Sequence, residues 1–155
     1  MENESHPNLP SGEWEGFYCY GNSPEQHKMA IALTFQNGVV TGSGTDDVAP
    51  FTWKGKYDLD AMKVYMTKVY ATHCIDYKGD IDENGIWGTW ENSEAILDIR
   101  QRFSSNAQQR ILRTFGAQIS GGFHIWPKKQ NADTVAKEAL AESDILKEIY
   151  EEIQR

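Results

Sequence analysis

Hydrophobic and polar positions alternate through most of residues 12–127. The clearest example is HKMAIALTFQ, residues 27–36, in which every second residue from Met29 to Phe35 is apolar. A period of two places apolar side chains on one face of a β-strand. The same rhythm predicts further strands in GEWEGFYCY (12–20), GVVTGSG (38–44), PFTWKGKYD (50–58), MKVYMTKVYAT (62–72), HCIDYKGD (73–80), IWGTWE (86–91) and GGFHIWP (121–127).

Short turn sequences separate these strands. Asn37-Gly38 suits the two positive-φ positions of a tight hairpin, and GNSPEQ (21–26) and DENG (82–85) are rich in turn-forming residues. Antiparallel strands with short connections leave exposed edges unless the sheet closes on itself. We therefore expect a mainly β fold, an antiparallel up-and-down barrel of eight strands or ten, with an open sandwich as the alternative.

The alternation stops in residues 92–120. SEAILDIRQRF (93–103) fits either a short strand or a helical turn capped by Ser93, and together with RILRTFGAQI (110–119) it could form a hairpin. A segment this long between strands is typical of a binding lid or a contact loop. It is therefore a candidate insertion for binding a partner.

Residues 131–155 have the composition of a helix. They are rich in Ala, Glu, Lys and Leu, and Asn131 or Asp133 can cap the N-terminus. One stripe at helical spacing contains Val135, Ala139, Leu146, Ile149, Tyr150 and Ile153. An isolated helix of this length is marginal in water, so the stripe needs its own barrel, a second copy or another protein.

The pattern divides the chain into a flexible N-terminal lead (1–11), a β-barrel domain (12–127) and a C-terminal amphipathic helix (131–155). The net charge of −8 argues against a nucleic-acid binder and against binding to an anionic membrane. The start of the sequence is polar, unlike a signal peptide, and no apolar run is long enough to span a bilayer. With two unpaired cysteines, Cys19 and Cys74, these features predict a cytoplasmic protein.

Gly12-Glu13-Trp14 at the first strand resembles the Gly-x-Trp opening of the calycin barrels, the group of lipocalins and avidins. The resemblance extends to the meander of strands and the terminal helix. It implies the barrel architecture and a Trp14 that packs across one end of the barrel. The first functional hypothesis is an intracellular small-molecule binding protein of this architecture. The disulfides of secreted lipocalins and the biotin-binding residues of avidins have no counterpart here.

Lys68 is the most informative candidate binding residue. If Val64 and Met66 face the barrel interior, Lys68 does too, and a buried ammonium is costly unless it meets an anion. The interpretation is a pocket for an anionic small molecule; the alternative is a Lys68 at the rim that reaches water. The candidate ligand-binding residues are Tyr18, Trp53, Lys68, Tyr77 and Trp90, although the tryptophans could instead fill the barrel.

No catalytic motif is present, so we expect a binding protein rather than an enzyme. The four histidines lack the spacing of a metal site, and the acids of Asp46-Asp47 and DIDENG (80–85) are interpreted as solvated turns. No cofactor is implied. The alternative function is a protein–protein interaction module with a filled barrel, in which the 92–120 insertion and the C-terminal helix contact the partner.

Overall fold

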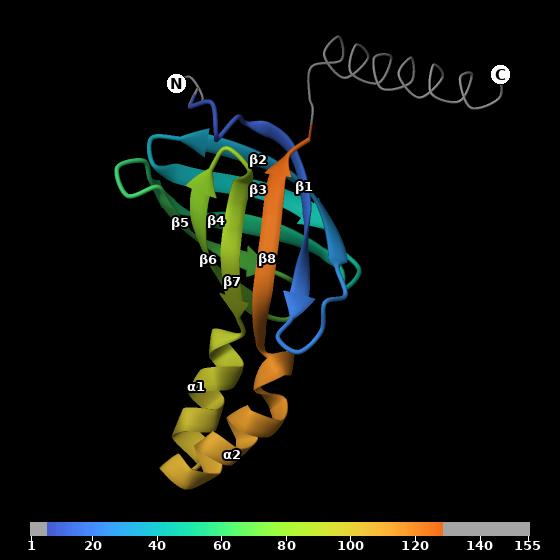
Figure 1. Cartoon of the computed structure of the whole chain (residues 1–155), viewed down its shortest axis with the longest axis vertical. Coiled ribbons are helices and arrows are strands. Elements are labelled where there is room, and N and C mark those ends of the chain that lie inside the picture. The colour runs from blue at the N-terminus through green and yellow to red at the C-terminus, as the bar shows by residue number, and fades with distance from the viewer. Residues whose placement is uncertain (1–5, 129–155) are drawn as a thin grey trace, which may run out of the picture.

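Eight antiparallel strands form one closed barrel (Figure 1). The computed structural model describes residues 6–128, so the predicted helix over 131–155 lies outside the described residues. The strands are β1 (Gly12–Tyr20), β2 (His27–Gln36), β3 (Val39–Thr45), β4 (Pro50–Asp58), β5 (Lys63–Val69), β6 (Cys74–Asp82), β7 (Gly85–Glu91) and β8 (Ser120–Pro127). Each strand pairs with its sequence neighbours, and β8 pairs with β1 to close the barrel. The predicted up-and-down barrel is confirmed with eight strands.

The tight turns follow the local chemistry of the sequence. Asn37 and Gly38, between β2 and β3, have φ angles of 52° and 79°, the left-handed region that a two-residue hairpin requires. Alternate side chains of β2 are buried from Met29 to Phe35, in step with the apolar pattern. The strand period therefore places one face of each strand inside the barrel.

Residues 92–120 contain two helices and no strand before β8. The helices are α1 (Ser93–Arg102) and α2 (Ser105–Phe115), and the short 3₁₀ turn η1 (Gly116–Gln118) leads into β8. The strand and β-hairpin alternatives were wrong. The helix start was also misplaced, because Asn92 rather than Ser93 caps α1: its Oδ1 accepts from the Ala95 backbone N–H at 3.0 Å.

The two helices form a hairpin that projects from the barrel beyond the ends of β7 and β8 (Figure 1). Ser104 caps α2 by accepting from the Ala107 backbone N–H at 3.3 Å. At the base, the Asn92 backbone N–H donates to the Ile119 carbonyl at 2.8 Å, which joins the two ends of the insertion. No side chain of α1 or α2 is buried.

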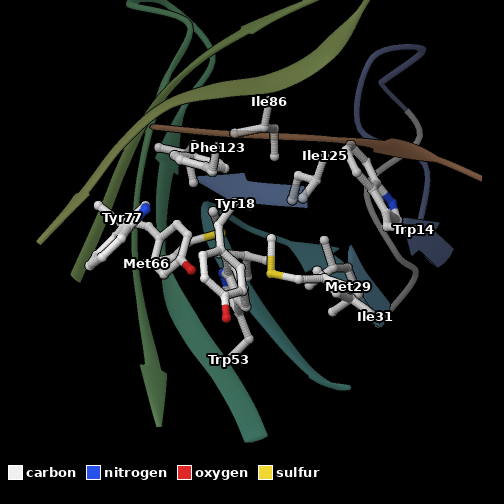
Figure 2. Packing of buried hydrophobic residues seen from close by; sticks show 14 of the residues in the cluster. Trp14, Tyr18, Met29, Ile31, Trp53, Met66, Tyr77, Ile86, Phe123 and Ile125 are labelled. Carbon is white, nitrogen blue, oxygen red and sulfur yellow. The ribbon is translucent and has the colours of Figure 1, made fainter. Parts of the chain in front are cut away.

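The opposite end of the barrel is closed by the start of the chain. Trp14 is 1% exposed, its indole N–H donates to the Pro10 carbonyl at 2.8 Å, and its ring lies 5.4 Å from that of Phe35. Figure 2 shows Trp14 at one edge of the core, beside Ile125. Residues 6–11, within the segment expected to be a flexible lead, form a turn and bury Leu9 completely. Burial of the apolar Leu9 side chain in the core explains why residues 6–11 form an ordered turn.

No helix within residues 6–128 is long and apolar enough to span a lipid bilayer.

Candidate ligand-binding site

A partly open pocket of about 120 Å³ lies at the barrel end from which the helices project, which we call the helical end. Its position follows from topology, because β1 ends here, β7 ends here, and the β3–β4 and β5–β6 loops turn here. The interior lining consists of Tyr18, Tyr20, Lys68, Tyr70, Ile75, Tyr77 and Trp90. The rim consists of Val48, His73, Asn92 and Gln118.

Four of the five predicted binding residues meet in this pocket: Tyr18, Lys68, Tyr77 and Trp90. Trp53 does not line it. Its ring lies against Tyr77 with the centroids 4.8 Å apart, and both residues belong to the buried core (Figure 2). The Trp53 indole N–H is buried without a hydrogen-bond partner.

Lys68 is 1% exposed and points into the barrel from β5. The alternative that placed its ammonium at the rim, in water, is therefore wrong. Its Nζ forms an ion pair with Asp46, whose side chain is fully buried in the β3–β4 loop. The anion expected beside a buried lysine is thus supplied by the protein, and the lysine does not call for an anionic ligand.

Aromatic rings and two further atoms surround the Lys68 ammonium. Nζ lies 3.3 Å from the Tyr77 Oη and 3.2 Å from the Met29 Sδ. It also lies 4.4 Å from the centroid of the Phe51 ring and 4.8 Å from that of Tyr18, within the range of cation–π attraction. Burial lowers the pKa of Lys68, and the attraction of Asp46 only partly opposes that effect.

Asp46 fixes the β3–β4 loop as well as the lysine. Its Oδ1 accepts from the backbone N–H groups of Val48 at 2.8 Å and Ala49 at 3.1 Å, and its Oδ2 accepts from the Tyr70 hydroxyl. Burial alone would raise the pKa of Asp46, but the hydrogen bonds from Lys68 and Tyr70 outweigh it and lower the pKa. The carboxylate is therefore held in its charged form.

A second carboxylate, Asp47, links two strands beside the pocket. It accepts from the Tyr18 hydroxyl at 2.6 Å and lies 2.5 Å from the His27 Nδ1. The Tyr18 and His27 rings stack with centroids 4.9 Å apart. Burial alone would raise the pKa of Asp47, but the hydrogen bonds from Tyr18 and His27 lower it. Burial and the neighbouring Asp47 together raise the pKa of Tyr18.

The interpretation of Asp46-Asp47 as a solvated turn was therefore wrong for Asp46, and the sequence pattern did not single out Tyr70 or His73 as pocket residues. Tyr70 donates to Asp46, and its ring stacks on His73 with centroids 4.7 Å apart. One signal could have found Asp46: in an up-and-down barrel, alternate loops share one end. A Thr-Asp-Asp loop after β3 and a lysine near the end of β5 therefore belong to the same end.

Trp90 is held in the pocket wall by the neighbouring backbone. Its indole N–H donates to the Cys19 carbonyl at 2.9 Å. A Cβ at Gly121 would lie 1.8 Å from that carbonyl oxygen and 2.9 Å from the Trp90 Nε1, so the position must be glycine. Cys19 and Cys74 are both free thiols.

The pocket combines aromatic walls with Lys68, whose ion-pair partner Asp46 lies behind the lining, an arrangement suited to a small ligand with an apolar ring and a polar group. Within residues 6–128, no three His, Cys, Asp or Glu side chains gather to hold a metal ion. No family model matches the chain, and no significant match was found among curated proteins or solved structures.

Proposed function

We propose that this protein is a calycin-like, cytoplasmic small-molecule binding protein whose ligand occupies the pocket at the helical end. The observation that carries the proposal is that Tyr18, Tyr77 and Trp90 line one open barrel end together with Lys68, which is paired with the buried Asp46. The two free cysteines support a reducing location. Binding without turnover is part of the proposal.

The energetics of the ion pair support a role in recognition. Desolvating two charges costs several kcal/mol each, and apolar replacements of buried pairs are often as stable or more stable. Lys68 and Asp46 are therefore poor choices for stability alone. A lysine in the wall of an aromatic pocket, held by a buried carboxylate, is well suited to orienting a polar group of a ligand.

The size and charge of the pocket define the ligand class. The volume of about 120 Å³ is close to that of a roughly 150 Å³ protein cavity that binds benzene. Lys68 is already neutralised by Asp46, and Asp47 lies nearby, so an additional negative charge gains little. We therefore infer a small, neutral, ring-containing molecule with one hydrogen-bonding group.

Thermal unfolding with three probes that share one ring tests this proposal: benzyl alcohol, benzoate and benzylamine. Benzyl alcohol at ten times its Kd should raise Tm by roughly 3–6 °C, because a ligand that binds only the native state stabilises it. Benzoate should give a smaller shift at equal concentration. The variant Tyr77→Leu keeps an apolar pocket wall but lacks the hydroxyl group, so it is the control for the part of the Tm shift that depends on this hydroxyl. If none of the three probes raises Tm, the binding proposal is wrong.

A second candidate function is an interaction module that uses residues 92–120. The α1–α2 hairpin exposes four large apolar side chains: Leu97, Phe103, Leu112 and Phe115. It also carries four arginines and only two acids, although the chain as a whole has a net charge of −8. A second copy of this acidic chain is thus an electrostatically complementary partner for the hairpin.

The mass in solution tests this second candidate. We expect the full chain to form a dimer by light scattering and Leu112→Ser/Phe115→Ser to be monomeric, because the exposed apolar contacts would be lost. Val48→Ser removes a similarly exposed apolar side chain elsewhere and serves as the control. A wild-type monomer at high protein concentration would contradict self-association through the hairpin.

A further inference from the structure

Lys68 contributes a primary amine to the residues around the proposed binding pocket. The lysine is one of the lining residues, together with Ile75, Tyr77 and Trp90, and its stem is enclosed by the barrel core. Lysines in desolvated pockets are the usual nucleophiles toward carbonyl compounds, because the uncharged amine is more accessible there. The same amine therefore offers chemistry beyond reversible contact.

We propose that Lys68 forms an imine with a small aromatic aldehyde in the pocket, an inference that rests on the proposed binding function. The ammonium transfers a proton to Asp46, and the neutral Nζ attacks the aldehyde carbon. A proton then moves from the attacking nitrogen to the new alkoxide oxygen, which gives a neutral carbinolamine. Asp46 returns the first proton to the carbinolamine hydroxyl, the C–O bond breaks, and water leaves. The product is a protonated imine, so ammonium plus aldehyde give iminium plus water with no change in charge.

The surroundings of Nζ suit the iminium as well as the ammonium. Asp46 ends the reaction as a carboxylate paired with the new cation, as it is paired with Lys68 in the structure. The rings of Phe51 and Tyr18 lie 4.4 and 4.8 Å from Nζ and stabilise a cation of either kind. No charge is created or left unpaired by the reaction.

Other groups around Nζ favour the attack of the amine on the aldehyde. The Tyr77 hydroxyl lies 3.3 Å from Nζ and can hydrogen-bond the carbonyl oxygen of the aldehyde. Burial lowers the pKa of Lys68, which increases the fraction of neutral amine. Ile75 and Trp90 provide apolar wall for the ring of the aldehyde.

The experiment uses benzaldehyde with sodium cyanoborohydride, which reduces an imine to a stable secondary amine. Peptide mapping by mass spectrometry then identifies the benzylated lysines. We expect Lys68 to be labelled at least about tenfold faster than Lys54 and Lys78, exposed lysines in the same molecule. Labelling that is equal at all three, or absent from Lys68, would overturn the proposal.

Two controls separate the imine from simple binding. Benzyl alcohol has a similar shape but cannot form an imine: if it raises Tm while Lys68 stays unlabelled, the imine fails and the binding function stands. If neither benzyl alcohol nor benzaldehyde acts on the protein, both fail. Asp46→Asn should slow labelling of Lys68 several-fold and leave Lys54 unchanged; an unchanged rate at Lys68 would show that Asp46 has no part in proton transfer.

Discussion

At the helical end, side chains that lie far apart in the sequence depend on one another for their contribution to stability. Lys68, Asp46 and Tyr70 come from two separate chain segments, and each needs the others to satisfy its polar atoms. The aromatic rings around Nζ shield the pair from water. A change at one of these residues therefore leaves a buried polar group without its partner, which costs more than the lost contact itself.

The variant Lys68→Met tests this coupling. It keeps the apolar stem but leaves Asp46 buried without its cation, so we expect a loss of about 3–5 kcal/mol in the free energy of unfolding. Lys68→Met/Asp46→Asn should lose less than the two single variants combined, with a coupling of about 1–3 kcal/mol. Urea unfolding measures all three, with the exposed Lys54→Met as control. Additive losses would contradict the coupling.

The pH dependence of stability follows from the same carboxylates. The folded-state pKa values of Asp46 and Asp47 lie below the ordinary value, so the folded state binds protons less readily than the unfolded state. Their stabilisation is fully present above about pH 4, near the unfolded pKa, and is lost as the pH falls through the lowered values. We expect Tm to fall on acidification from pH 5 to pH 2, and to fall less in Asp46→Asn. Parallel curves would count against Asp46 as a source of the acid sensitivity.

At the scale of elements, the insertion between β7 and β8 is held at its base rather than along its length. Asn92 caps α1 through its side chain and ties the insertion to Ile119 through its backbone. The helices themselves bury no side chains, so packing contributes little to them. Local capping is thus expected to matter more here than in a helix packed on a core.

Replacing Asn92 with Ala should therefore weaken α1. The side-chain acceptor is lost while the backbone bond to Ile119 remains, and we expect a local cost of about 1 kcal/mol. Hydrogen exchange of the first α1 amides should be about fivefold faster, as that free energy implies. Asn106→Ala, within the first turn of α2, removes an exposed asparagine that caps nothing. Equal protection of α1 in wild type and Asn92→Ala would contradict the role of the cap.

At the scale of the whole molecule, the two barrel ends differ. One end is closed by Trp14 and Leu9, and the other holds the pocket and the helical hairpin. Because the eight strands have no free edge, the barrel supports both ends at once. A substitution at the closed end can thus lower stability without changing the pocket.

The variant Trp14→Ala tests the closed end. Removing a fully buried indole should cost about 3–5 kcal/mol in the free energy of unfolding, measured by urea denaturation. Trp87→Ala, at a tryptophan that is 43% exposed, should cost much less. Trp14→Ala should still bind benzyl alcohol below its Tm, because Trp14 does not line the pocket. Equal costs for the two tryptophans would show that Trp14 does not close the barrel end.

The sequence by itself predicted an antiparallel up-and-down barrel of eight strands or ten, because alternation and tight turns act between near neighbours, and the structure settled the number at eight. It also selected Tyr18, Lys68, Tyr77 and Trp90, which line the pocket, and Trp53, which does not, because an inward position on a strand does not show whether the side chain reaches the pocket. Only the tertiary structure decided that residues 92–120 form helices: their apolar residues are exposed, so no buried face sets a clear period. Only the tertiary structure brought Asp46 to Lys68, because the β3–β4 loop has to fold over the inner face of β5 for the two side chains to meet.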